Sequence, residues 1–322
     1  MIKTLLTTGW GCTYPILNAS MTPAATGLLA RTVTGAGGFG MIGVNETWTG
    51  EDIRRECAIA RQNDASLRFG IGFFGWALER SPDLLEVAIE QRPFLISISF
   101  IDVAPYAKQV HGAGIVLAAQ VQTGRDARAA LDGGVDVLIA QGTEAGGHTG
   151  DVSTLTMLQI ALNITDKPVL AAGGIATAQG LAGVLAAGAA GAWIGTPFLV
   201  TKEANVTDAA RERILAADET QTVLTALFDT LQGFPWPERF KGRALRNELT
   251  ERWHGHEADA VADPDLIAAL RAAKANDDFR IANIYAGQSA GLISARCSAA
   301  DVVTGLGLGA ERVLRESFAR LL

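Results

Sequence analysis

Residues 135–150 read Val-Asp-Val-Leu-Ile-Ala-Gln-Gly-Thr-Glu-Ala-Gly-Gly-His-Thr-Gly. The first six are mostly apolar, which is typical of a strand that is buried on both faces. The rest form a glycine-rich loop that carries a single histidine. In parallel α/β barrels, such a loop follows the carboxyl end of a strand, where active sites form. This junction therefore predicts a parallel sheet with a functional site at its carboxyl edge.

Further short apolar runs lie on both sides of this junction and alternate with longer helical patterns up to about residue 200. Together with the run at 135–140, they predict eight strands at residues 15–19, 39–43, 69–73, 95–100, 115–121, 135–140, 169–171 and 192–194. Eight strands interleaved with helices favour a closed TIM (β/α)8 barrel. An open doubly wound α/β sheet is the second interpretation.

The composition of the chain changes after Thr201. Residues 205–280 are charged, rich in alanine and helical in pattern, with breaks at Pro235, Pro237 and Pro264. We expect residues 1–204 to form the barrel and residues 205–280 to form a helical insertion or lid after strand eight. Residues 281–322 turn apolar again and end in a helical pattern, so we expect them to return to the barrel.

Composition excludes several classes of protein. The chain has 322 residues and a net charge of −7, which argues against a nucleic-acid-binding protein. Its three cysteines, Cys12, Cys57 and Cys297, are scattered and predict reduced thiols rather than disulfides or a zinc site. The uncharged stretch between Lys167 and Lys202 is broken by glycines and does not predict a membrane span. With no signal-peptide pattern at the N-terminus, we expect a cytoplasmic protein.

His148 is the strongest candidate for a catalytic residue. It lies between glycines at a predicted strand end, and an imidazole exchanges protons near neutral pH. No second histidine or cysteine is near it in the sequence, so a metal site is not expected.

Two later turns predict a phosphate site. Gly173 and Gly174 follow the seventh predicted strand, and Gly195 and Thr196 follow the eighth. TIM barrels commonly hold phosphate with the loops after these two strands. Backbone N–H groups at these positions could bind a phosphate dianion without any Lys or Arg.

Two short motifs fail on their context. Gly35-x-Gly37-x-x-Gly40 fits a dinucleotide-binding pattern, but it follows a predicted helix and opens a strand, so we expect an ordinary αβ turn. Gly287-x-Ser289-x-Gly291 fits a nucleophile elbow, but no histidine follows it in the chain, as a serine hydrolase of that type requires.

These motifs together resemble the nitronate monooxygenase (2-nitropropane dioxygenase) family of FMN-dependent TIM-barrel oxidoreductases. The resemblance is carried by residues 141–150, 171–175, 195–199 and 286–291. It implies an FMN enzyme that oxidises alkyl nitronates, or nitroalkanes, with O2 to a carbonyl compound and nitrite. Related barrels with the same loop use NAD(P)H to reduce a quinone or an enoyl thioester, which is the first alternative. A flavin-free phosphate-binding isomerase or lyase is the second.

The resemblance also implies roles for individual residues. His148 matches the family's catalytic histidine. The positions that match cofactor contacts are Ala19, Ser20, Met21, Gln120, Gln141, Gly146, Gly173, Gly174, Trp193, Ile194, Gly195, Thr196, Gln288 and Ser289. The chain departs from the family at Asn18 and Ser20, in a segment that is often Gln-Ala-Pro-Met, and at Gly72, where the family often has a flavin-binding Asn. The implied partners are a small-molecule substrate and O2 or NAD(P)H, and a homodimer is compatible with the resemblance.

Overall fold

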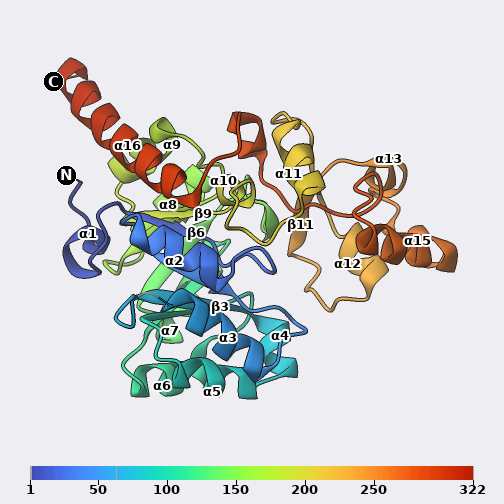
Figure 1. Cartoon of the computed structure of the whole chain (residues 1–322), viewed down its shortest axis with the longest axis horizontal. Coiled ribbons are helices and arrows are strands. Elements are labelled where there is room, and N and C mark those ends of the chain that lie inside the picture. The colour runs from blue at the N-terminus through green and yellow to red at the C-terminus, as the bar shows by residue number, and fades with distance from the viewer. Residues whose placement is uncertain (1, 63, 322) are drawn as a thin grey trace.

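Eight parallel strands form a closed barrel in the computed structural model, which describes residues 2–62 and 64–321 (Figure 1). The strands are β1 (Ile16–Asn18), β2 (Gly40–Gly43), β3 (Phe69–Phe74), β4 (Leu95–Ser99), β5 (Val116–Val121), β6 (Val137–Gln141), β8 (Val169–Ala172) and β9 (Gly191–Ile194). Their order is β1-β9-β8-β6-β5-β4-β3-β2, and a parallel bridge between Leu17 and Phe39 joins the two outermost strands. The TIM barrel predicted from the apolar runs is confirmed.

Alternation along the strands separates two apolar cores. Leu138 belongs to the core between strands and helices, whereas Ile139 belongs to the core inside the barrel. The interior core continues into α1 (Leu5–Gly9) and Trp10, whose ring packs 5.3 Å from that of Phe39. The amino end of the barrel is therefore filled with side chains, which leaves the carboxyl end for a ligand.

Helices cover the outside of the barrel. They are α2 (Gly27–Gly35), α3 (Gly50–Ala60), α4 (Gly75–Arg80), α5 (Asp83–Glu90), α6 (Ala104–Gly112), α7 (Gly124–Asp132), α8 (Thr154–Leu162) and α9 (Ala178–Ala186). The short α10 (Thr196–Leu199) follows β9 at the carboxyl end of the barrel. Thr49 caps α3 in a reciprocal capping box with Asp52. The Gly35–Gly40 motif ends α2 and opens β2, with Gly37 at a φ of +91°, so it is the expected αβ turn.

The segment after the eighth barrel strand lies to one side of the barrel (Figure 1). Its elements are α11 (Asp208–Leu215), β10 (Thr222–Thr225), α12 (Leu227–Gln232), β11 (Lys241–Leu245), α13 (Glu248–Trp253), α14 (Glu257–Val261) and α15 (Pro264–Ala275). It contains short helices, and it also contains two strands that we did not predict. β10 pairs with β11, and β11 pairs with β7 (Gly147–Thr149), which lies inside the glycine-rich loop.

The C-terminal segment returns to the barrel through η1 (Gln288–Leu292) and α16 (Ala299–Leu321). α16 runs beside α9 and α2 (Figure 1). The contact with α9 is close, because a Cβ atom added at Gly309 would lie 2.6 Å from Cβ of Ala178. Among the described helices, none is long and apolar enough to cross a bilayer.

Candidate active site

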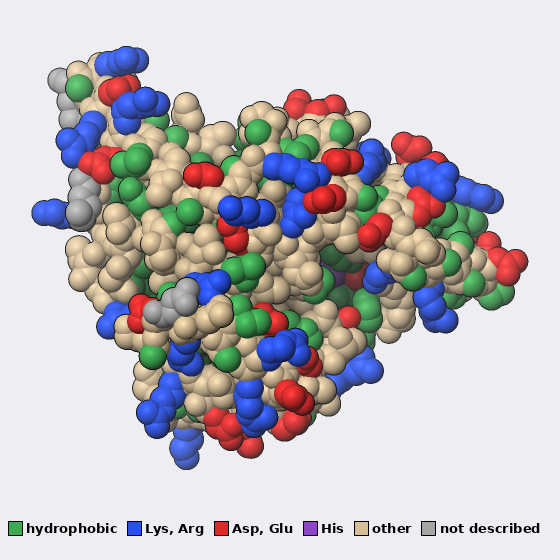
Figure 2. Space-filling view, in the orientation of Figure 1, with side chains coloured by type: hydrophobic (Ala, Val, Ile, Leu, Met, Phe, Trp, Pro, Cys, Tyr) green, Lys and Arg blue, Asp and Glu red, His purple; other side chains and the backbone are tan. Residues whose placement is uncertain are grey.

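A cavity of about 540 Å³ opens at the carboxyl end of the barrel. The ends of the strands form one side of it, and residues of α11, α12, α15 and the segment 279–289 form the other. The space-filling view shows a hollow between the barrel and the α12–α15 segment, with charges of both signs scattered over this face (Figure 2). The cavity therefore belongs jointly to the barrel and to the segment after it.

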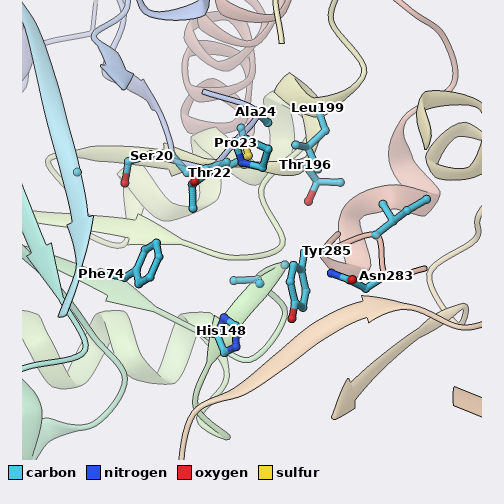
Figure 3. Close-up of a pocket in the computed structure, with 18 of the residues that line it drawn as sticks. Ser20, Thr22, Pro23, Ala24, Phe74, His148, Thr196, Leu199, Asn283 and Tyr285 are labelled. Carbon is cyan, nitrogen blue, oxygen red and sulfur yellow. The ribbon is translucent and has the colours of Figure 1, made fainter. Parts of the chain in front are cut away.

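The structure brings nearly all the predicted site residues together around this cavity. Those that line it are Ala19, Ser20, Met21, Gln120, Gln141, Gly146, His148, Gly173, Gly174, Trp193, Ile194, Gly195, Thr196 and Ser289. Gln288 is the exception. Its backbone N–H donates to the carbonyl of Glu144 at 3.0 Å, so it ties the C-terminal segment to the glycine-rich loop. Figure 3 shows His148 and Thr196 projecting from different parts of the chain toward the same space.

The imidazole of His148 has two neighbours that fix its position. One lies in the plane of the ring and the other stacks on one face of it. Its Nε2 atom lies 2.9 Å from Oδ2 of Asp229, and the two side chains are only 10% and 6% exposed. The indole of Trp236 stacks on the imidazole, with ring centroids 3.5 Å apart and planes 9° apart. Within residues 2–62 and 64–321, Nδ1 of His148 has no hydrogen-bond partner. This second nitrogen is therefore available to a ligand.

Asp229, Trp236 and Tyr285 also belong to the site, although the sequence does not predict them. Asp229 lies on α12, next to the buried Leu227 and Phe228. A carboxylate among apolar residues of a short helix is expected to have a partner, because charged groups are rarely buried alone. The sequence around Asp229 does not identify that partner as His148. Tyr285 donates its hydroxyl hydrogen to Oδ1 of Asp229 at 3.2 Å. Burial of the Tyr285 hydroxyl raises its pKa well above 10, and the Asp229 charge adds to this effect, so the hydroxyl remains a donor.

Neighbouring elements hold the glycine-rich loop. The carboxylate of Glu144 accepts hydrogen bonds from the backbone N–H and the hydroxyl of Thr154, at 2.8 and 2.6 Å, at the start of α8. Arg243 on β11 donates to the carbonyl of Thr143 at 2.6 Å. The side-chain amide of Gln141 donates to the carbonyl of His148 at 3.0 Å. The loop is therefore bonded to α8, to the barrel and to the segment after the barrel.

The two glycine turns present free backbone donors to the cavity. Gly173 and Gly174 have φ angles of +111° and +70°, which favour glycine. The N–H groups of Gly173, Gly174, Gly195 and Thr196 have no acceptor anywhere in the described part of the chain. Free backbone N–H groups at two neighbouring strand ends of one cavity fit a bound anionic group such as a phosphate.

Other polar atoms at the cavity also lack partners. Oγ1 of Thr22, Nε1 of Trp76 and Oδ1 of Asn283 are buried and make no hydrogen bond within residues 2–62 and 64–321. Aromatic rings form the wall near His148, where Phe74 packs 4.9 Å from Trp76 and 5.6 Å from Trp236. A cavity with an apolar wall and unpaired polar atoms is typical of a ligand site.

The departures from the family pattern have structural explanations. Asn18 is fully buried and bonds the backbone of Met41 through both its amide nitrogen and its oxygen, so it links β1 to β2. Gly72 faces Ser20, because a Cβ atom at position 72 would lie 2.2 Å from the Ser20 hydroxyl oxygen. The two departures at 20 and 72 therefore accommodate each other on the cavity wall.

Comparison with known proteins places the chain in a family. The model of the nitronate monooxygenase family matches residues 81–309. A Mycobacterium tuberculosis protein, Rv1533, named for a monooxygenase activity, is 34% identical over 236 residues, which are 68% of this chain and 60% of the relative. FabK from Thermotoga maritima has a TM-score of 0.86 at 27% identity, with both chains fully covered. A nitroalkane oxidase from Streptomyces ansochromogenes has a TM-score of 0.82 at 25% identity, covering 95% of this chain and 98% of its own. Since the family match covers more than half of the residues, this chain belongs to the nitronate monooxygenase family, a family of flavin-dependent oxidoreductases.

Proposed function

We propose that this protein is a cytoplasmic FMN-dependent enzyme that oxidises alkyl nitronates with O2, giving a carbonyl compound and nitrite. One observation carries the proposal: His148 and the free N–H groups of Gly173, Gly174, Gly195 and Thr196 line the same cavity. A flavin phosphate bound at the glycine turns would place the rest of the cofactor in the space that His148 borders. The likeness to a nitroalkane oxidase supports this substrate class.

The residues present fit FMN. The four N–H groups can donate to phosphate oxygens, so they can hold the phosphate without a Lys or Arg beside it. Among the described residues, Lys274 on α15 is the only Lys or Arg on the cavity wall. The unpaired polar atoms of Thr22 and Asn283 are available to the polar edge of a ring system. FMN, when bound, supplies the electron transfer from nitronate to O2.

His148 acts on the substrate in this proposal. Its free Nδ1 can accept a proton from the carbon next to the nitro group when a neutral nitroalkane enters. When the substrate arrives as the nitronate anion, no proton needs to be removed, and the protonated form of the same side chain, which carries hydrogen on both ring nitrogens, would orient the anion by donating to it. The enclosing rings of Trp236 and Phe74 keep bulk water away from this exchange.

The experiment begins with the absorption spectrum of the purified protein and the release of FMN on boiling. The anaerobic protein is then mixed separately with a nitronate and with NADH. Bleaching of the yellow colour by nitronate supports the proposal. Bleaching by NADH instead would favour the reduction of a quinone or an enoyl thioester. A colourless protein that releases no flavin would favour a phosphate-binding isomerase or lyase.

A further inference from the structure

We propose that Asp229 is the positioning residue of His148, and that it sets the imidazole tautomer. In this assignment, Nε2 of His148 carries the hydrogen that Asp229 accepts, and Nδ1 carries the lone pair that faces the substrate. The role rests on the proposed function, in which His148 takes a proton from a neutral nitroalkane.

The geometry of His148 and Asp229 fits this tautomer. The Nε2 to Oδ2 distance of 2.9 Å is that of a good charge-assisted hydrogen bond, and both side chains are nearly enclosed. A neutral imidazole has one N–H and one lone pair, and a carboxylate can only accept. A carboxylate at Nε2 therefore holds the proton there and leaves Nδ1 basic.

The other carboxylate oxygen of Asp229 also has a partner. Tyr285 donates to Oδ1 of Asp229, and its raised pKa keeps that hydrogen in place. With one oxygen held by Tyr285 and the other by His148, the carboxylate has a fixed orientation. An Asn at position 229 would keep its oxygen toward Tyr285 and turn its NH2 group toward Nε2 of His148. Nε2 would then have to accept, and the imidazole hydrogen would move to Nδ1.

Two further charged side chains lie near His148 and Asp229. Lys274 on α15 and Glu46 after β2 also line the cavity, and both act electrostatically near Asp229 and Tyr285. Lys274 donates to the side-chain oxygen of Gln232, one turn after Asp229 on α12. Residues 2–62 and 64–321 offer no other acidic side chain within hydrogen-bond reach of His148. The tautomer therefore depends on Asp229.

The segment after the barrel therefore positions the proposed base, His148. Asp229 lies on α12 and Trp236 follows it, so the in-plane and stacking partners of His148 both come from outside the barrel. A barrel without this segment would present the histidine without its proton-fixing partner.

The test compares Asp229→Asn with the parent enzyme on a neutral nitroalkane and on its preformed nitronate. We expect kcat with the nitroalkane to fall by about 10²-fold or more, because that reaction needs the base. With the nitronate, kcat should stay within about tenfold of the parent, because no proton is removed. A general structural defect would lower both rates together.

The second readout is independent of activity. Histidine ¹⁵N NMR reports which ring nitrogen carries hydrogen, and His148→Gln assigns the resonance. At a pH where the imidazole is neutral, we expect hydrogen on Nε2 in the parent and a shift toward Nδ1 in Asp229→Asn.

The chain offers a matched control. His111 Nε2 lies 3.0 Å from Oδ2 of Asp136, a similar pair that is about 40% exposed and lies outside the cavity. Asp136→Asn should leave both rates and the His148 resonance unchanged.

Two results would overturn the inference: hydrogen on Nδ1 of His148 in the parent, or equal rate changes for the two substrates in Asp229→Asn. If the parent fails to oxidise nitronate at all, the proposed function is wrong, and the NMR result still decides the role of Asp229.

Discussion

The imidazole of His148 and the indole of Trp236 lie face to face, with centroids 3.5 Å apart and planes 9° apart. The indole is itself fixed from the barrel, because its ring packs edge-on against Phe100 at 5.1 Å and stacks against Phe74 at 5.6 Å. The histidine is therefore oriented by contacts that do not involve the glycine turns after β8 and β9. Chemistry and cofactor retention should be separable by mutation.

His148→Ala tests that separation. We expect turnover of a nitroalkane to fall by about 10²- to 10⁴-fold, the usual contribution of a general base. Bound FMN should stay near the parent level, because the free N–H groups of Gly173 and Gly174 are untouched. Steady-state kinetics and the flavin absorbance of the same preparation check both parts. Unchanged turnover would remove His148 from the reaction.

Gly173→Ala should weaken FMN binding. Gly173 has a φ of +111°, and a Cβ atom there would lie 2.6 Å from Oγ1 of Thr154. The strained turn would move its N–H groups, so we expect at least about a tenfold higher Kd for FMN, corresponding to about 1–3 kcal/mol of strain. Titration of the apoprotein with FMN measures the change.

Gly183→Ala is the matched control for this substitution. Gly183 lies inside α9, and no atom lies within 4 Å of its added Cβ. Its FMN affinity should equal that of the parent, and its stability should rise by about 0.5–1 kcal/mol. Equal Kd values for Gly173→Ala and Gly183→Ala would contradict the phosphate site.

The parts of this fold that the sequence predicts are those formed by residues close together in the chain. The eight barrel strands are local apolar runs, so they can be recognised one by one. β7 is a three-residue strand whose partner β11 begins at Lys241, almost a hundred residues later. Such a strand has no local signal, which explains why the small sheet was not predicted.

The candidate site divides in the same way. His148 and the glycine turns lie at strand ends, where the barrel itself brings them together. Asp229, Trp236 and Tyr285 reach His148 only through the packing of α12 and the segments that follow it. No spacing rule connects those segments to the loop after β6, so only the structure identifies them.

Tyr285→Phe should change the response of stability to alkaline pH. Burial raises the pKa of Tyr285 well above 10, while an unfolded tyrosine titrates near 10. Above about pH 10 the folded state therefore holds a proton that the unfolded state has lost, and stability falls as pH rises. Below that pH, this group adds no pH dependence.

Urea unfolding of the parent and Tyr285→Phe between about pH 9 and about pH 11 measures the difference. The parent should lose stability more steeply, by up to one proton in the slope. Cys12 and Cys57, whose pKa values burial raises to about 12, act equally in both proteins. Parallel curves would show that the Tyr285 hydroxyl titrates normally.

Gly72 and Ser20 should be energetically coupled. A Cβ atom at position 72 would lie 2.2 Å from Oγ and 2.4 Å from Cβ of Ser20, while the next neighbour, the carbonyl of Ile42, is 3.8 Å away. Gly72→Ala alone should therefore destabilise the protein by about 1–3 kcal/mol through overpacking. Ser20→Gly in the same chain removes both colliding atoms and should recover most of that loss.

A double-mutant cycle on the free energy of unfolding measures this coupling directly. We expect Gly72→Ala to cost much less in the Ser20→Gly background than in the parent. Additivity within about 0.5 kcal/mol would mean that the two side chains move apart freely. Coupling would instead mean that a larger residue at position 72 is incompatible with Ser20 unless the cavity wall rearranges.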